Sequence, residues 1–390
     1  MDATRKLYEE DAYLREFTAV VVDCRERKNG WAVELDRTAF YPEGGGQPAD
    51  QGMITPVSSP ESARVEDVHE KEGKVWHYVD RPLDTGTAVI GKIDWERRFD
   101  LMQQHSGEHI VSGLVHNRFG YDNVGFHMGS DVITIDFNGL LMEEDLQLIE
   151  REANQVIVSN ALTEIFFPDP EELKELEYRS KKELTGKVRI VRFPGGDTCA
   201  CCGTHVKRAG EIGVVKLLSV VKFREGVRVE MISGSRVLDW IRVIAGQNHL
   251  ISVRLSAKPD QTAKAVERLG QENFELRGQI ARLEAKEFAR LAGDYSGKGD
   301  VLLFEEGLEA DSVRRLADTV MQSCGGRCAV FSKKADGTFM YAMGQAGGDL
   351  RALVKDMNQA LSGRGGGKPF FVQGQVTAGE EKIREFFQKL

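Results

Sequence analysis

The stretch DTCACCGTHV (residues 197–206) holds a cysteine and a histidine four residues apart around a glycine, and upstream HSGEH (residues 105–109) holds two histidines at the same spacing. Histidines four apart share one face of a helix, where they can bind a single ion. One such pair alone is more often exposed or core-capping than a metal site. Two pairs together favour zinc over magnesium or calcium, so we expect one Zn²⁺ per chain. The candidate ligands are His105, His109, Cys201 and His205.

Two other zinc chemistries do not fit these residues. In the metalloprotease motif HExxH the glutamate directly follows the first histidine, whereas Glu108 precedes the second one. The nucleobase deaminase pattern requires H-x-E with P-C-x-x-C, which is absent around Cys201. Cys199 and Cys202 are additional thiols that can take the place of Cys201, so the choice of sulfur ligand stays open.

Length and composition indicate a folded multidomain protein. A chain of 390 residues predicts two or three domains, and 41% hydrophobic with 29% charged residues is ordinary for globular proteins. Six cysteines are too few for a disulfide scaffold, and no apolar run is long enough to span a membrane; we therefore expect a cytoplasmic protein. The net charge of -9 argues against bulk electrostatic binding of nucleic acid, although residues 179–230 contain twelve basic and five acidic residues.

Hydrophobic patterning predicts an α+β multidomain fold. Short alternating segments with a hairpin turn near Gly30 predict a small N-terminal β-barrel, and from Trp95 the period becomes helical. A strand at 132–137, a helix at 146–158 and strands on both sides of the cysteines predict an α+β zinc-containing domain. The expected domains are 1–95 (β-barrel), 96–235 (zinc-binding domain), 236–295 (helical arm) and 296–390 (C-terminal α/β domain).

The helical arm carries a heptad pattern of apolar residues from Val266 to Leu283, with Asn273 at an a position. About three heptads suit either the stem of a homodimer or an αα-hairpin packed on its own chain. Beyond residue 299 the pattern predicts strand, helix, strand, strand, helix, a glycine loop and a final helix.

These motifs in combination resemble a known family. HxxxH, then CxxxH about ninety residues later, with FYPEGGGQP (residues 40–48) upstream, resembles the editing domain of alanyl- and threonyl-tRNA synthetases. Cys202 stands where that family usually has glycine. KFREGVRVEMISG (residues 222–234) resembles the end of the synthetase-associated domain, and GGGKP (residues 365–369) resembles the DHH-associated C-terminal domain. The chain is similar to the freestanding alanyl-tRNA editing proteins of the long type.

The resemblance implies a zinc-dependent deacylase that hydrolyses Ser-tRNA(Ala) in trans, and it leaves Gly-tRNA(Ala) open as a second substrate. It places Thr38 beside the bound amino acid and His127 at a polar position that orients water, whereas a lone histidine is more often structural. It implies tRNA contact by further residues, namely Gly44, Gly45, Gly46, Gln47, Arg364 and Lys368. Against this, residues 44–47 also fit a plain tight turn.

Two other functions remain open from the sequence. One is a tRNA-binding accessory protein in which zinc is structural, and the other is a metallohydrolase of small esters or amides. The deacylase hypothesis has a physical basis, because an alanine-binding pocket cannot strongly exclude serine, which adds one hydroxyl. Discrimination between the two amino acids must therefore be repeated at a second site. Such a site can require the hydroxyl through a partner such as Thr38.

Overall fold

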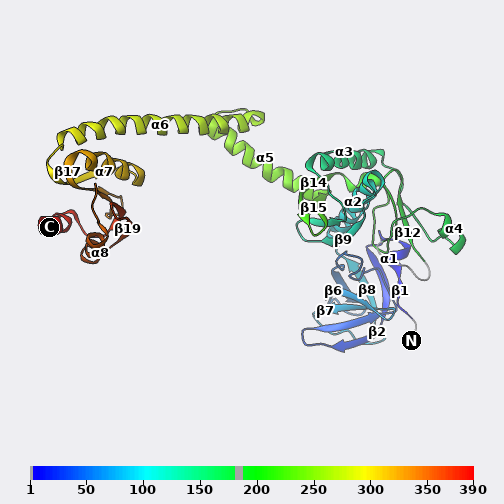
Figure 1. The fold of residues 1–390 in the computed structure, drawn as a ribbon. Helices are drawn as coiled ribbons and strands as arrows, with labels where there is room; N and C mark the ends of the chain where they lie inside the picture. Colours follow the sequence, from blue (N-terminus) through cyan, green and yellow to red (C-terminus); the bar gives the residue numbers. More distant parts are fainter. Residues whose placement is uncertain (1–2, 181–187) are drawn as a thin grey trace. The chain divides into compact units, whose positions relative to one another are not determined.

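The computed structural model describes residues 3–180 and 188–390, which divide into two compact units between Gln247 and Asn248 (Figure 1). No helix within these described ranges combines the length and apolar character needed to cross a membrane. Each unit has its own hydrophobic core and is considered separately.

The N-terminal part of the first unit is a closed antiparallel barrel, as predicted (Figure 1). Exposure alternates along its strands because successive side chains of a strand point to opposite faces. The inward side chains form the barrel core, in which Val33, Leu35 and Ile54 are fully buried. In barrel order the strands are β2 (Glu16–Glu26), β3 (Trp31–Leu35), β7 (Lys74–Val79), β6 (Ala63–Lys71), β5 (Gly52–Pro56) and β8 (Ala88–Ile93).

The segment between β3 and β5 connects the barrel with the rest of the unit. It begins with β4 (Arg37–Thr38), which pairs in parallel with β1 (Arg5–Lys6) ahead of the short helix α1 (Leu7–Glu10). Its later residues, 39–50, include a tight turn closed by hydrogen bonds between Gly44 and Gln47 in both directions. This segment reaches the site described below.

The remainder of the first unit is α+β, which also agrees with the sequence. A 25-residue helix, α2 (Trp95–Phe119), begins after Asp94, whose side chain accepts a hydrogen bond from the Arg97 N–H, and ends at Gly120 in the left-handed conformation. Its core contains Leu101, Ile110 and Val115. The other elements of this region are α3 (Glu143–Ser159), α4 (Pro170–Glu175), η1 (Ala209–Ile212) and the first part of α5 (Ser235–Leu255).

Two antiparallel sheets accompany these helices. Three of their strands were not expected, because their short or polar sequences lack an alternating pattern: β9 (Asn123–Met128), β11 (Glu164–Phe166) and β13 (Asp197–Ala200). The four-stranded sheet has the order β14 (Val215–Phe223), β15 (Gly226–Ser233), β10 (Ile133–Phe137) and β9 (Asn123–Met128). The three-stranded sheet has the order β11 (Glu164–Phe166), β12 (Ile190–Phe193) and β13 (Asp197–Ala200).

A buried ion pair joins α2 to the barrel side of the unit. The Arg98 and Asp50 side chains have no exposed surface, and Arg98 Nε donates to Asp50 Oδ1 at 2.9 Å. The same guanidinium donates to the Ala39 carbonyl at 2.6 Å. Arg98 lies seven residues before His105, so the pair holds the ligand-bearing helix close to segment 39–50.

The second unit contains the end of α5, η2 (Pro259–Gln261), the 33-residue helix α6 (Thr262–Asp294) and an α/β domain. Neighbouring residues of the strand β17 (Gly325–Lys333), such as Val330 and Phe331, belong to different cores on the two faces of its sheet. The domain comprises β16 (Gly299–Glu306), α7 (Ala310–Cys324), β17 (Gly325–Lys333), β18 (Phe339–Gln345), α8 (Arg351–Ala360), β19 (Gly363–Lys368), β20 (Phe371–Val376) and α9 (Glu380–Gln388).

The prediction of a glycine loop before the final helix is wrong. The glycines form the edge strand β19, which pairs in an antiparallel hairpin with β20. Glycine normally weakens strands, but here it permits close packing. A Cβ on Gly365 would lie 2.3 Å from the Tyr341 hydroxyl and 2.4 Å from the Gln373 carbonyl oxygen.

Candidate metal centre

The two ligand pairs predicted from the sequence meet in the first unit. His105 and His109 project from α2, while Cys201 and His205 follow β13, and one ligand atom from each residue lies within 4.8 Å of the others. Cys201 Sγ lies 3.6 Å from His105 Nε2 and 3.4 Å from His205 Nε2. The three histidines are buried and Cys201 is partly exposed. This donor set, three imidazoles and one thiol, suits zinc.

Gln47 orients the first histidine of this cluster. Its Oε1 lies 2.9 Å from His105 Nδ1, and its amide also bonds to the backbone N–H and hydroxyl of Thr204. A side-chain carbonyl oxygen only accepts hydrogen bonds, so Nδ1 of His105 carries the proton and Nε2 presents its lone pair to the cluster. Gln47 therefore links the segment after β4 to both ligand pairs.

Asp197 has the same role for the second histidine. Its Oδ2 lies 2.8 Å from His109 Nδ1, which keeps a proton on Nδ1 and directs Nε2 at the cluster. Ser106 Oγ lies 3.3 Å from His205 Nδ1. Each imidazole thus has a partner on Nδ1, an arrangement typical of metal-binding histidines.

The electrostatics of the cluster favour a thiolate. Burial disfavours the charged form of Cys201, but the surrounding His105, His109 and His205 outweigh it and hold its pKa well below the usual range. Burial lowers the pKa of His205 to about 3. Burial also opposes charge on His109, but the Cys201 thiolate and Asp197 raise its pKa to about 10. A thiolate is the form of cysteine that binds metal.

The other two cysteines of the motif differ in their surroundings. Cys199 is buried near His109 and Asp197, and burial raises its thiol pKa. Cys202, in contrast, is exposed. Of the three thiols, Cys201 lies among the imidazoles, whereas its role as the metal ligand stays a prediction.

Backbone contact holds the two ligand-bearing elements together. A Cβ on Gly113 of α2 would lie 2.3 Å from the Gly196 carbonyl oxygen and 2.8 Å from the Cα of Asp197. The helix backbone therefore runs directly against the turn that precedes β13, one turn of helix after His109.

Comparison with known proteins shows the family to which the chain belongs. Three family models match: class II (A) tRNA synthetases at residues 9–97, the threonyl and alanyl tRNA synthetase second additional domain at 188–237, and the DHHA1 domain at 288–390. The mouse alanyl-tRNA editing protein Aarsd1 is 31% identical over 67% of this chain and 67% of its own length. This chain belongs to the alanyl-tRNA editing protein family.

Two further relatives extend the match along the chain. The alanyl-tRNA editing protein AlaX-L of Pyrococcus horikoshii is 29% identical over 97% of this chain and 96% of its own length. An alanine–tRNA ligase of Ignicoccus hospitalis is 31% identical over 99% of this chain, which spans 43% of the ligase's length. The family predicted from the sequence motifs is thereby confirmed.

In this editing-family chain, Thr38 lies fully buried with two hydrogen-bond partners. Its hydroxyl lies 2.8 Å from His77 Nε2 and accepts from the Phe40 N–H at 3.1 Å. His77 Nδ1 faces the Val33 carbonyl oxygen at 3.0 Å, so Nδ1 donates there and Nε2 accepts the Thr38 proton. Burial lowers the pKa of His77 to about 4, which keeps its ring neutral. Thr38 consequently has only an oxygen lone pair left for a further partner.

The glycine turn at residues 44–47 lies against the metal centre. Gly46 has a φ of +86°, and a Cβ there would lie 2.4 Å from the Phe126 ring. That ring stacks on His105 with centroids 5.5 Å apart. The turn thus needs glycine for both conformation and space. The predicted contact of Gly44, Gly45 and Gly46 with substrate stays a prediction.

The other predicted residues are exposed on strands. His127 is exposed on β9 and, one residue after Phe126, points to the opposite face of that strand. Arg364 and Lys368 are exposed on β19 of the second unit. Their predicted functions remain predictions.

Several residues around the site were not identified from the sequence. Ser106 and Asp197 lie inside or beside the quoted motifs, so their positions were visible but their bonds to histidine were not. Nothing in the sequence marks Phe126 as part of the site, and His77 has no histidine or cysteine at a spacing typical of metal ligands.

Proposed function

We propose that this protein is a zinc-dependent deacylase that hydrolyses the ester of tRNA(Ala) mischarged with serine. Two observations support it: membership of the alanyl-tRNA editing family, and the clustering of three imidazole nitrogens and one sulfur within 4.8 Å of one another. The second observation carries the proposal, because it provides the chemistry such an enzyme requires.

The residues divide this task between holding an ion and recognising the amino acid. His105, His109, Cys201 and His205 would hold the zinc, which when bound supplies a fixed positive centre for the ester and the terminal adenosine. Gln47 and Asp197 keep two imidazoles in the required tautomer. Thr38, with its proton given to His77, would accept a hydrogen bond from the seryl hydroxyl, which an alanyl group lacks.

The direct test is hydrolysis of three substrates by the purified full chain: Ser-tRNA(Ala), Ala-tRNA(Ala) and Ser-tRNA(Ser). We expect rapid loss of the first ester at catalytic protein concentrations and little loss of the second. No hydrolysis of Ser-tRNA(Ala) would refute the proposal. Equal hydrolysis of all three would indicate a general esterase.

Matched variants connect activity with the metal. His105→Ala should lose both zinc and hydrolysis, whereas His116→Ala, which removes a partly exposed histidine from the same helix, should retain both. Cys201→Ser should lower zinc content more than Cys202→Ser, because Cys202 is exposed and apart from the imidazoles. Full activity of a metal-free sample would contradict the zinc requirement.

One observation favours a second candidate, a tRNA-binding accessory protein with structural zinc. Four protein ligands complete a tetrahedral zinc, whereas hydrolytic sites generally keep one position open. That alternative predicts stoichiometric zinc and tRNA binding without ester hydrolysis, so the same substrate assay separates the two.

We also propose that α6 pairs with a second copy of the chain. Within the C-terminal unit its heptad residues are exposed, and Glu272 and Arg277 place opposite charges at the g and e positions around Asn273. Leu276→Glu should therefore yield a monomer in sedimentation experiments, with Lys264→Glu as an exposed control. A monomeric unmodified chain would refute pairing. The apolar heptad residues are Val266, Leu269, Leu276, Ile280 and Leu283.

A further inference from the structure

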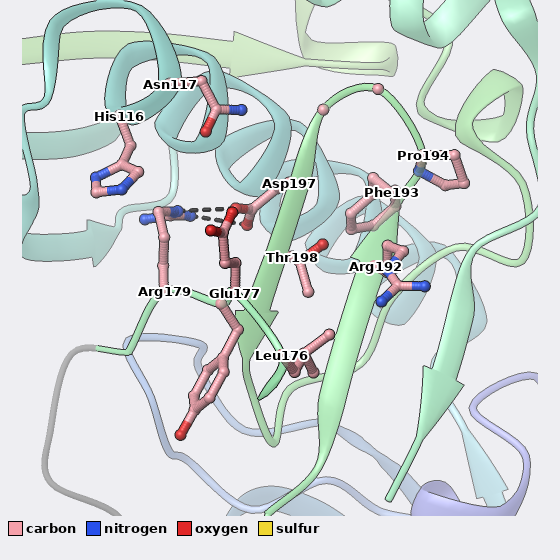
Figure 2. A pocket seen from close by; sticks show the side chains of 13 residues that line it. His116, Asn117, Leu176, Glu177, Arg179, Arg192, Phe193, Pro194, Asp197 and Thr198 are labelled. Atoms are coloured by element: carbon pink, nitrogen blue, oxygen red, sulfur yellow. Dashed lines mark hydrogen bonds and ion pairs between the residues drawn. The ribbon is translucent and has the colours of Figure 1, made fainter. Parts of the chain in front are cut away.

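Arg179 forms two hydrogen bonds to the Asp197 carboxylate, which orients the candidate ligand His109. Arg179 Nε donates to Asp197 Oδ1 and Nη2 donates to Oδ2, both at 2.8 Å, as the dashed lines in Figure 2 show. The same Oδ2 accepts from His109 Nδ1 at 2.8 Å. The side chains of Arg179 and Asp197 are 11% and 1% exposed. A continuous hydrogen-bonded path thus leads from a guanidinium to a candidate metal ligand.

The backbone places Arg179 for this contact. Its N–H donates to the Thr198 carbonyl and its carbonyl accepts from the Ala200 N–H, each at 2.9 Å. Arg179 therefore lies as a bridge alongside β13, although it precedes Asp197 by eighteen residues. Because main-chain bonds fix its Cα, the guanidinium reaches Asp197 without relying on a flexible loop.

We propose that Arg179 is a positioning residue of the metal centre, acting through Asp197 on His109. This inference rests on the metal site of the proposed function. The planar guanidinium engages both carboxylate oxygens, which fixes the carboxylate plane and keeps Oδ2 directed at His109. It also neutralises a carboxylate that has almost no access to water. Without these two hydrogen bonds, the Asp197 carboxylate can rotate and the His109 imidazole loses its fixed orientation.

A second arginine in the same wall provides a matched control. Arg179 and Arg192 both line an open cavity of about 740 Å³ (Figure 2). Arg192 pairs instead with Glu164 at 3.0 Å, and these two side chains are 36% and 46% exposed. Removing Arg192 deletes the same chemical group from the same cavity without touching Asp197.

The experiment measures Zn²⁺ affinity of the full-length protein by competition with a chromophoric chelator. Arg179→Met should weaken zinc binding by about 10- to 100-fold, as losses in the outer shell of metal sites do, whereas Arg192→Met should leave it unchanged. Arg179→Lys keeps the positive charge but not the two parallel hydrogen bonds to Asp197, so its zinc affinity should lie between that of Arg179→Met and that of the unmodified chain. Co²⁺-substituted Arg179→Met should also show altered ligand-field absorption, which a purely structural role for Arg179 would not produce.

Combining Arg179→Met with Asp197→Asn tests the path itself. If Arg179 acts through Asp197, adding Arg179→Met to Asp197→Asn should weaken binding little further. Full additivity of the two losses would overturn the inference, as would unchanged zinc affinity in Arg179→Met. If Arg179→Met does not fold by circular dichroism, Arg179→Lys carries the same test. A chain that binds no zinc before substitution refutes the proposed metal site instead, so the two failures are distinguishable.

Discussion

Replacing Thr38 by valine tests whether a buried hydroxyl selects seryl over alanyl esters. Valine keeps the shape but removes the oxygen that bonds to His77 Nε2 and to the Phe40 N–H. Leaving two fully buried groups unpaired costs about 1–3 kcal/mol each, so the unfolding free energy should fall by about 2–6 kcal/mol. Loss of the contact to the substrate hydroxyl should cost a further 1–3 kcal/mol or so in discrimination, roughly 5- to 150-fold.

The assay compares initial hydrolysis rates of Ser-tRNA(Ala) and Ala-tRNA(Ala) at a temperature where the variant is folded. In Thr38→Val, the ratio of the Ser-tRNA(Ala) rate to the Ala-tRNA(Ala) rate should be smaller, while the zinc content stays at the level of the unmodified chain. Thr38→Ser is the control, because it keeps the hydroxyl and both hydrogen bonds. An unchanged ratio in folded Thr38→Val, or an equal loss in Thr38→Ser, would refute recognition by this hydroxyl.

Three further predictions concern stability and tRNA binding. Burial lowers the pKa of His77 to about 4, so below pH 6.5 or so the unfolded chain binds a proton that the folded chain excludes. The free energy of unfolding should therefore fall by about 2 kcal/mol between pH 7 and pH 5. Urea unfolding at pH 7 and pH 5 measures this fall, and an equal pH dependence in His77→Gln would exclude His77 as its source. Arg98→Met leaves Asp50 buried without its partner and should lose about 3–5 kcal/mol in the same experiment, whereas a loss below about 1 kcal/mol would contradict a structural role. If Arg364 and Lys368 contact tRNA phosphates, replacing each by alanine should reduce the slope of log affinity against log salt by about 0.7–0.9, and unchanged slopes would assign binding to other residues.

The part of the fold that could be predicted is the part governed by local pattern. Alternation along β6 and the helical period of α2 depend on neighbours a few residues away, and so does the spacing of His105 and His109. Strand β19 could not be predicted, because glycine alone indicates a turn and its strand conformation depends on hydrogen bonds to β20.

The support of the site depends on contacts distant in sequence. Gln47 and His105 are 58 residues apart, and Thr38 and His77 are 39 apart. Spacing between residues carries no information about which barrel loop packs on which helix. The candidate ligands were therefore visible in the sequence, while the groups that set their tautomers emerged with the tertiary structure.

The backbone contact at Gly113 determines what can stand between the two ligand-bearing segments. A Cβ at this position would lie 2.3 Å from the Gly196 carbonyl oxygen and 2.6 Å from the Asp197 Cβ, so any larger residue would force α2 and the start of β13 to shift. His109 lies one helical turn before Gly113, and Asp197, which bonds to His109, lies at the contact itself. A substitution at Gly113, which offers no ligand atom, would therefore displace one ligand pair relative to the other.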